Sequence, residues 1–426
     1  MKRLALVTGG LAAAGLVICC SARADMVTDW NQNFEKAAKT AAQLPPIEAR
    51  CAAIVQTAVF DAVNGIHRRY ESYLVTERAP GGARADAAVA QAAYTALKAL
   101  YPAQAATFDA ELAASLASIS GHEGKSKSIA RGLAWGEQVA NTILAARSLD
   151  GFSATLPGYF GGGAPGIWRS IPTGTNADGT LPAVFPQLRY VVPFAIASPS
   201  QFRPGPPPAL TSAHYAADVN EVKAIGRVNS TTRTSDQTQL AQLWQATSIA
   251  DVFRGVRGAL PAHGSMVDEA RLLALVSMAS FDALIAIFDA KYTYNLWRPY
   301  HAIRLADTDG NPSTDVDPTW TSLVFPPRHQ EYPSAHCIAT GASMRVLSRV
   351  LGDEHAFVLS SPGFPSFTWT FERFSDAAAQ VKEARIWAGI HFRNSCDVGG
   401  AMGVALGDYV LEHALLPLGH EGEDEE

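Results

Sequence analysis

The sequence predicts an all-α fold, and three observations support this prediction. Apolar residues recur at three- and four-residue spacing through 45–150, 213–256 and 267–291, which is the pattern of a helix with one buried face. We find no Val/Ile-rich alternation of the kind that indicates a sheet. The 426-residue chain is 48% hydrophobic and 17% charged, so it can bury a large core as an ordinary globular protein does.

The N-terminal part is expected to span 25–212. Three helices are predicted there, in "IEARCAAIVQTAVFDAVNGI", "ADAAVAQAAYTALKALY" and "SKSIARGLAWGEQVANTILAARS". Gly and Pro then become dense in 150–212, as in "GYFGGGAPGIW" and "FRPGPPPAL", and the helical period disappears. We expect a long loop that packs on the protein surface, not a flexible linker, because this segment contains aromatic residues that need burial: Trp168, Phe185, Tyr190 and Phe194.

The C-terminal part is expected to span 213–418 and to belong to the same globule. Helices are predicted near 335–351, 376–390 and 400–415, after an irregular stretch at 305–333. The acidic end of the chain, 419–426, is expected to be disordered.

The first 24 residues have the pattern of a secretory signal peptide. Lys2 and Arg3 precede an apolar run that ends at Cys20, and Ala22-Arg23-Ala24 offers a cleavage site before Asp25. We therefore expect a secreted or periplasmic protein. No other apolar run is judged long enough to span a bilayer, so no stable membrane insertion is expected.

Charge and cysteine content exclude other classes. The formal net charge is −6, and the expected leader takes three basic residues with it, so binding to nucleic acid is not expected. The remaining cysteines, Cys51, Cys337 and Cys396, lack the paired spacing of a metal site. A Cys337–Cys396 bridge and three buried thiols are both open interpretations.

Basic residues and histidines gather in three short segments of the C-terminal part. In "KYTYNLWRP", Lys291 and Arg298 are seven residues apart; on one helix they would share a face, about 10 Å apart along the axis. The two cations could then converge on one multivalent anion. The alternative is that they form ordinary salt bridges with Asp282 and Asp289.

The second segment, "PSAH", precedes a run that is predicted to be helical. Ser334, the Ala335 N–H and His336 could bind an anion at the helix N-terminus, or Ser334 could simply cap the helix. The third segment contains Arg385 and His391. Together the three segments could saturate the oxygens of a tetrahedral oxyanion and place a histidine on either side of its central atom. In-line phosphoryl transfer needs this arrangement, and it would also trap vanadate.

These motifs resemble those of a known superfamily. Lys291…Arg298-Pro299, Pro333-Ser334-Ala335-His336 and Arg385…His391 are similar to the three signatures shared by type 2 phosphatidic-acid phosphatases, bacterial class A acid phosphatases and vanadium-dependent haloperoxidases. Segments such as "FDALIAIFDAKYTYNLWRPYHAIR" resemble the long, secreted haloperoxidase branch, and the similarity extends over about 45–415. The resemblance implies a helical bundle of the vanadium haloperoxidase and acid phosphatase type.

The resemblance also implies a role for each residue. His391 would bond vanadium; Lys291, Arg298, Ser334, Arg385 and the Ala335 N–H would bind the oxygens of vanadate, for which phosphate competes. His336 would be the acid–base group, and Lys291 would also polarise bound peroxide. The implied reaction oxidises halide with hydrogen peroxide to a hypohalous species, which halogenates a small organic acceptor. Family members often form homo-oligomers, and the resemblance allows one here.

Three features bear on which activity the chain has. His329 stands where bromoperoxidases of the family carry histidine, which favours bromide or iodide, although a surface histidine is the alternative. Ala335 stands where the motif normally has glycine, so a non-catalytic oxyanion-binding relative is one alternative. A secreted acid phosphatase with a phosphohistidine intermediate is the other. Phosphatases orient their histidine with an acid four residues later, where this chain has Ser395, and this disfavours them.

Overall fold

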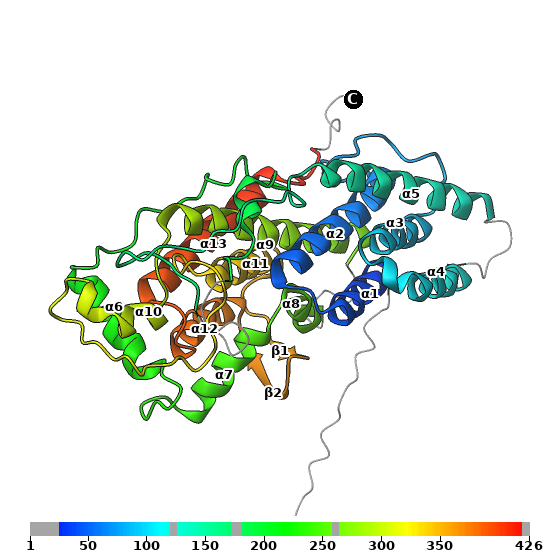
Figure 1. The fold of residues 1–426 in the computed structure, drawn as a ribbon. Coiled ribbons are helices and arrows are strands. Elements are labelled where there is room, and N and C mark those ends of the chain that lie inside the picture. The colour runs from blue at the N-terminus through cyan, green and yellow to red at the C-terminus, as the bar shows by residue number, and fades with distance from the viewer. Residues whose placement is uncertain (1–24, 120–125, 172–180, 258–263, 420–426) are drawn as a thin grey trace, which may run out of the picture.

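The computed structural model describes residues 25–119, 126–171, 181–257 and 264–419, and these are mainly helical, which confirms the predicted fold class (Figure 1). The helices of the N-terminal part are α1 (Met26–Ala41), α2 (Pro45–His67), α3 (Ala85–Leu100), α4 (Ala105–Ile119) and α5 (Ser126–Ser148). Those of the C-terminal part are α6 (Ala213–Ile225), α7 (Ser235–Ala246), α8 (Ile249–Val256), α9 (Met266–Tyr294), α10 (Pro299–Arg304), α11 (Ala335–Leu351), α12 (Phe374–Trp387) and α13 (Arg393–His413). The expected leader, and the expected tail from residue 420 onward, lie outside the described residues.

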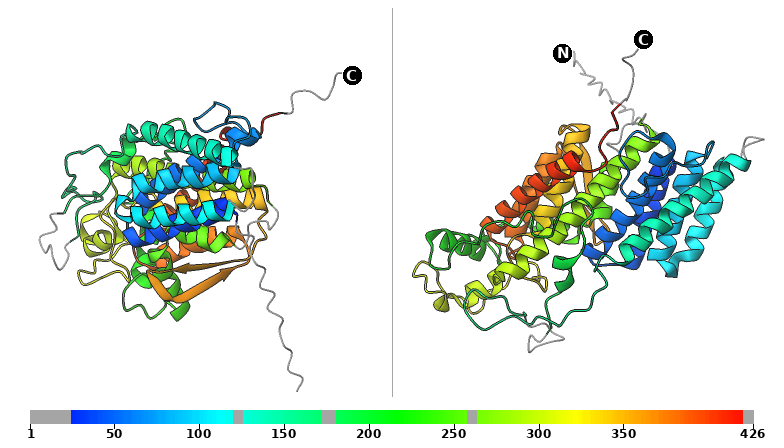
Figure 2. Two further views of the ribbon diagram at one scale, coloured as in Figure 1. Left: turned by 90° about the vertical axis from the view of Figure 1, so that its right-hand side faces the viewer. Right: turned by 90° about the horizontal axis from the view of Figure 1, so that it is seen from above.

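Helix α9 is the central element of the bundle. It packs against α2 on one side and α11 on the other, as the view from above shows (Figure 2). Ser265 caps its start by accepting a hydrogen bond from the Asp268 N–H, and Asn295 ends it in the left-handed conformation. One hydrophobic core extends from Met26 in α1 to Leu415 after α13, so side chains of both parts of the chain contribute to it.

Helix α9 also corrects one expectation. Its 29 residues are long and apolar enough to cross a membrane, whereas we expected no apolar run of that length after the N-terminal one. Its most apolar window is entirely buried among the other helices, which is the environment of a core helix in a bundle.

Helices α11 and α13 approach each other closely because of a stripe of glycines. Gly399, Gly403 and Gly407 are four residues apart and therefore share one face of α13. A Cβ atom added to Gly403 would lie 2.5 Å from the Ile338 carbonyl oxygen of α11. The absence of side chains at these positions lets the two backbones come together beside the start of α11.

The Gly/Pro-rich stretch packs along the bundle where it is described. The buried carboxylate of Asp282 on α9 accepts three backbone N–H groups of this stretch, at 2.7–2.9 Å, from Phe194, Ala195 and Ile196. Trp168 and Phe194 are buried and Phe185 is half-buried, as the sequence suggested, whereas Tyr190 is 64% exposed, contrary to that expectation. The stretch is therefore fixed to the helix that also carries Lys291.

A β-hairpin and the helices α1, α4 and α10 were not among the predicted elements. Strands β1 (Phe357–Ser361) and β2 (Phe364–Phe371) pair as an antiparallel hairpin, although no sheet was expected. Alternating aromatic and threonine residues in "FTWTF" are its sequence signal. Helix α1 was also missed; Asp25 caps it and Trp30 and Phe34, one turn apart, bury its apolar face.

Candidate oxyanion site

Lys291 and Arg298 converge through a break in the helix. Lys291 lies in the last turn of α9, the chain turns at Asn295, and Arg298 is the N-cap residue of α10. The expectation of one continuous helix was therefore wrong, because left-handed Asn295 and Pro299 end one helix and start the next. Both cations are fully buried, so the break directs the second one inward as well.

The alternative partners of these cations are engaged elsewhere. Asp282 accepts backbone N–H groups, and Asp289 forms an ion pair with Arg203 at 2.7 Å. No ion pair joins Lys291 or Arg298 to either aspartate in the described part of the chain. The salt-bridge interpretation of these two residues is therefore wrong.

The "PSAH" segment begins α11, as predicted. Ser334 occupies the N-cap position, but its hydroxyl makes no capping hydrogen bond, so the ordinary cap is not what it provides. The buried Ser334 Oγ has no hydrogen-bond partner among the described residues. Ala335 is the first residue of the helix and does not have a positive φ, so the alanine introduces no backbone strain.

Arg385 and His391 come from the connection between α12 and α13. Arg385 lies in the last turn of α12, and His391 follows a turn at Gly389, where φ is +77°. A Cβ at Gly389 would lie 2.3 Å from the Gly226 carbonyl oxygen, so glycine is needed for this close approach. Arg385 and His391 are both buried, at 0% and 1% exposure.

Three cations thus lie in one buried cluster. Burial lowers the pKa of Lys291 well below its usual value, and proximity to Arg298 lowers it further. Burial likewise lowers the pKa of Arg298 to about 9 and that of Arg385 to about 10. Glu331 is the carboxylate that faces Lys291 and Arg298, and burial raises its pKa to about 7. A cluster with this excess of buried positive charge favours the binding of an anion.

The three cations differ in the donors they have available. Lys291 Nζ donates to the carbonyls of Gln330, Glu331 and Pro333, at 2.8, 2.8 and 2.5 Å, which uses all its protons. Arg385 donates from Nη2 to Gln245 at 2.7 Å, whereas its Nε and Nη1 have no partner within the described ranges. Arg385 and Ser334 therefore hold the buried donors that an incoming oxyanion could engage directly.

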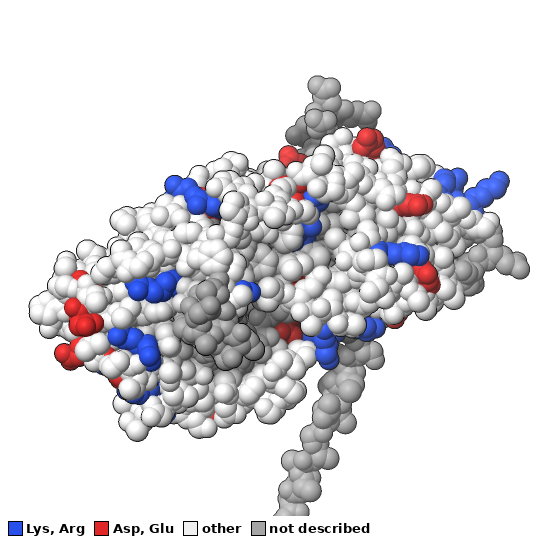
Figure 3. Space-filling view, viewed as in Figure 1, with Lys and Arg blue, Asp and Glu red and all other residues white. Residues whose placement is uncertain are grey.

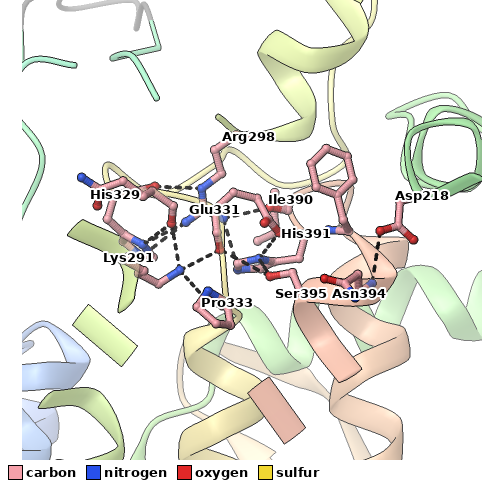
Figure 4. A network of polar contacts seen from close by, with 12 residues as sticks. Asp218, Lys291, Arg298, His329, Glu331, Pro333, Ile390, His391, Asn394 and Ser395 are labelled. Atoms are coloured by element: carbon pink, nitrogen blue, oxygen red, sulfur yellow. Dashed lines mark hydrogen bonds and ion pairs between the residues drawn. The ribbon is translucent and has the colours of Figure 1, made fainter. Parts of the chain in front are cut away.

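His391 is held in one tautomer by its neighbours (Figure 4). Arg298 Nη1 lies 3.2 Å from His391 Nε2, and because a guanidinium only donates, Nε2 must accept. The proton of the neutral ring is then on Nδ1, which lies 2.7 Å from Glu331 Oε1 and donates to it. Burial and the nearby cations lower the pKa of His391 well below 6.5, so the ring is neutral and its Nε2 lone pair faces the cluster.

Glu331 is the functional residue that sequence reasoning missed. It is fully buried, and its Oε1 also accepts the Phe392 N–H at 3.0 Å. Ser395, the residue in the place of the phosphatase acid, lies 3.4 Å from His391 Nδ1. The orienting carboxylate is therefore supplied by a residue 60 positions before His391, and the only sequence signal was an acid three residues before Ser334.

A cavity of about 700 Å³ leads to this cluster. Phe185, Phe288 and other apolar side chains line it, together with His329, Ala335 and His336. The His336 ring contacts the backbone carbonyl of Trp244, and burial together with the cations lowers its pKa well below 6.5. His336 is thus a neutral, proton-accepting group at the boundary between the cavity and the buried cations.

His329 also lies at this boundary. His329 Nδ1 lies 3.0 Å from Arg298 Nη2 and 3.1 Å from the Gln330 carbonyl oxygen, and the ring lies 5.3 Å from that of Phe288. His329 is therefore a half-buried member of the cavity wall, and the surface-loop interpretation of this residue was wrong.

Comparisons with known proteins agree with this geometry. The family model for the second helical-bundle domain of VCPO matches residues 271–418, the region that carries the three motifs. The C-terminal part of the chain is therefore similar to a helical-bundle domain of the vanadium haloperoxidases. Vanadium chloroperoxidase of Curvularia inaequalis is 26% identical over 264 residues, a match that covers 50% of this chain and 42% of that relative's length.

Solved structures of vanadium haloperoxidases share the fold. A bacterial vanadium-dependent iodoperoxidase aligns with a TM-score of 0.75 and 24% identity, over 92% of this chain and 96% of its own. The apo and holo forms of a bacterial vanadium-dependent chloroperoxidase align with TM-scores of 0.69 and 0.68, at 18% and 19% identity. Each of these two alignments covers 87% of this chain, and they cover 94% and 93% of the apo and holo chains. At these identities the likeness establishes the fold and leaves the halide open.

Proposed function

We propose that the protein is a vanadate-dependent haloperoxidase that oxidises halide, with bromide favoured, by hydrogen peroxide to a hypohalous species. The observation that carries this proposal is the cluster of three buried cations beside the Nε2 lone pair of a neutral histidine. A vanadium centre needs a nitrogen donor on one side and hydrogen-bond donors for several charged oxygens. His391 Nε2 supplies the former.

The residues present fit vanadate. Arg385 Nε and Nη1 and Ser334 Oγ are buried donors for which the described chain offers no acceptor, and an oxyanion would satisfy them. The Ala335 N–H at the start of α11 would bind a further oxygen. Arg298 could bind one only by exchanging a present contact, because its three nitrogens already contact other groups. Lys291 would reach an oxygen only by exchanging one of its three carbonyl partners, so its charge contributes more directly than its hydrogen bonds.

When bound, vanadate would act as a Lewis acid that activates peroxide, and the oxidation state of vanadium would not change. The protein would orient the bound oxyanion and balance its negative charge. Glu331 holds the proton of His391 on Nδ1 and so keeps Nε2 unprotonated; vanadate would replace Arg298 Nη1 as the partner of that lone pair. His336, neutral because its pKa is low, would accept a proton from peroxide with the ring nitrogen that does not contact Trp244. Hydrogen peroxide, halide and a small organic acceptor would enter through the apolar cavity.

The preference for bromide rests on His329. Its ring lines the cavity and contacts Arg298, so a halide in the cavity would lie next to a side chain that touches the oxyanion cluster. We infer that this histidine replaces an aromatic wall that would better suit chloride. A His329→Phe variant is expected to lower bromide turnover relative to chloride turnover; an unchanged ratio would exclude His329 as the determinant.

One observation favours an acid phosphatase as the second candidate. The Glu331–His391 contact supplies the orienting acid whose absence at Ser395 had disfavoured phosphatase chemistry. With phosphate in the site, His391 Nε2 would attack phosphorus and His336 would protonate the leaving alcohol. The argument for a non-catalytic relative is weaker, because Ala335 starts its helix without strain.

A parallel assay distinguishes these candidates. The chain from residue 25 is stripped of phosphate, loaded with orthovanadate and assayed for peroxide-dependent bromination of monochlorodimedone. Hydrolysis of p-nitrophenyl phosphate is measured on the vanadate-free protein. We expect bromination that requires vanadate, is lost in His391→Ala and is retained in the matched control His413→Ala, whose ring is exposed. Phosphate release without bromination would move the assignment to phosphatase.

A further inference from the structure

Two buried cysteines lie beside the oxyanion cluster and have no part in the proposed chemistry. Cys337 follows His336 in the first turn of α11, and Cys396 follows Ser395 in the first turn of α13. Their exposures are 1% and 0%, and both are free thiols. The structure thus shows buried thiols and not a disulfide, and it places Cys337 and Cys396 next to each other.

The two helix starts are joined where these cysteines lie. The Ser334 N–H donates to the Ser395 carbonyl across the two helices at 3.1 Å. One turn further along, a Cβ on Gly399 would lie only 3.3 Å from Cys337 Cβ. Residues three apart share a helix face, so Ser334 and Cys337 face α13, while Cys396 and Gly399 face α11. The two thiols therefore face each other across the closest part of the α11–α13 contact.

Each of the two thiols lies close enough to the other to shift its pKa. Burial would raise the pKa of Cys337, but interactions with Cys396, Ser334 and Arg385 lower it below its usual value. Burial and the Cys337 thiol raise the pKa of Cys396 well above its usual value. Cys51, on α2 and away from this cluster, has its pKa raised by burial to about 11. Cys337 directly follows Ala335 and His336, which line the cavity, so it is the thiol that peroxide from the cavity would reach first.

We propose that Cys337 and Cys396 are a dithiol that hydrogen peroxide oxidises to a disulfide joining α11 to α13 beside the oxyanion site. The Cys337 thiolate attacks one peroxide oxygen; the O–O bond breaks, and one water and a sulfenic acid form. Cys396 then attacks the Cys337 sulfur, its proton leaves with the hydroxyl as a second water, and the S–S bond forms. In total, one peroxide and two thiols give one disulfide and two waters.

The proposed function supplies the oxidant, and this inference rests on it for that reason. Peroxide that enters the cavity reaches Ala335 and His336, the two residues that immediately precede Cys337. Peroxide is not much larger than water, so it can pass where an organic molecule cannot. The enzyme would thus be modified by its own substrate at a position next to its site.

Disulfide formation should weaken oxyanion binding. A disulfide fixes the two sulfurs about 2.05 Å apart and the two Cβ atoms about 3.8 Å apart, closer than the contact of two thiols requires. Because the first turn of α11 carries Ser334 and the Ala335 N–H, any shift of Cys337 toward Cys396 would displace these donors as well. Since sites of this kind tolerate displacements of only about 0.5 Å, we expect affinity for the anion to fall about tenfold.

The experiment needs neither vanadate nor halide. The reduced chain from residue 25 is treated with hydrogen peroxide, denatured and alkylated, and its peptides are analysed by mass spectrometry; inorganic phosphate binding is measured by calorimetry before and after treatment. We expect a peptide pair crosslinked through Cys337 and Cys396, a Cys51 that remains alkylated, and phosphate affinity that falls about tenfold and recovers with dithiothreitol.

Matched variants separate this result from general oxidation. Cys51→Ser should behave as the wild type, whereas in Cys337→Ser and Cys396→Ser peroxide should form no crosslink and leave phosphate affinity unchanged. Alkylatable Cys337 and Cys396 after treatment, or oxidation of Cys51 at the same rate, would overturn the proposal. A crosslink without any change in phosphate affinity would refute its coupling to the site. Because no halide is used, a protein that fails to brominate can still confirm the dithiol.

Discussion

Replacement of Arg385 by methionine should weaken anion binding without lowering the stability of the anion-free fold. Arg385 is buried at 0% exposure, and its Nε and Nη1 have no partner in the described chain. Methionine is unbranched and flexible, so it can occupy much of the same space without charge. The change removes two donors that the oxyanion would use and one cation whose burial is costly without an anion.

The two consequences have opposite signs. A hydrogen bond to a charged group contributes about 1.5–3 kcal/mol, so the loss of two should weaken oxyanion binding by about 3–6 kcal/mol, or roughly 10²- to 10⁴-fold. Without an anion, loss of the buried charge should leave stability unchanged or raise it, because buried ions are often replaced by apolar groups without cost. The lost hydrogen bond to Gln245 offsets this gain only partly, since Gln245 lines the cavity and can be hydrated.

Calorimetric titration with phosphate and thermal unfolding with and without phosphate measure both quantities. At a phosphate concentration 100 times the Kd, the wild type should gain about 2.7 kcal/mol of stability, and the variant should gain almost none. Arg373→Met is the matched control, because Arg373 is exposed at the start of the same helix and pairs with exposed Glu354. Wild-type phosphate affinity in Arg385→Met, or a large loss of anion-free stability, would refute the assignment of Arg385 to the anion.

Four further predictions concern the same cluster. Glu331→Gln removes the carboxylate that orients His391 and should lower bromination 10- to 100-fold in steady-state assays; full activity would show that this contact is dispensable. Ala335→Gly should change phosphate affinity less than about twofold, because the residue already has helical geometry; a large gain in calorimetry would restore the argument for strain. Gly403→Ala should destabilise the fold by about 1–3 kcal/mol in denaturant unfolding, since its Cβ would meet the Ile338 carbonyl; unchanged stability would contradict this close packing. The site histidines have folded-state pKa values well below 6.5, so they stabilise the anion-free protein above pH 6.5, and this contribution is lost as pH falls below 6.5. Glu331, whose pKa is raised to about 7, instead stabilises the folded protein at low pH, and its contribution is lost as pH rises through 7. A melting temperature that falls less steeply toward pH 5 with phosphate than without it is the expected result, and parallel curves would contradict it.

The sequence was sufficient to predict the fold class and to single out the cations and histidines that the structure brings together, although not Glu331, because helical periodicity and short motifs are local properties. It also contained the signals for the break after α9, in Asn295 and Pro299, but the spacing of Lys291 and Arg298 was interpreted as helical instead. A seven-residue spacing fits two helical turns, so the cations alone could not reveal that the helix ends between them.

The local sequence pattern could not reveal the role of Glu331. It is defined by a contact with His391, 60 residues later, which exists only once α11 and α13 are packed together. The availability of Ser334 Oγ is also a three-dimensional property, because serine before a helix normally caps it. The sequence also does not show which hydrogen-bond donors have partners or which of the three cations has free N–H groups. Both depend on residues that are distant in the sequence and become neighbours only in the folded chain.

Surface charge contributed little to the assignment. On the face shown in Figure 3, acidic and basic side chains are interspersed over the described residues, which gives no indication of the buried cluster. The cations that matter are those at 0% exposure, where an uncompensated charge has the greatest effect on binding.

A crystal structure of the protein grown or soaked with orthovanadate tests the central claim most directly. The account predicts density for an oxyanion bonded to His391 Nε2, with Arg385 and the Ser334 hydroxyl on its oxygens and His336 toward the cavity. It also predicts that at least one carbonyl contact of Lys291 is exchanged if that residue takes part. Vanadate bound elsewhere, or a cluster that remains free of any anion at saturating vanadate, would contradict the assignment of this cluster as the oxyanion site.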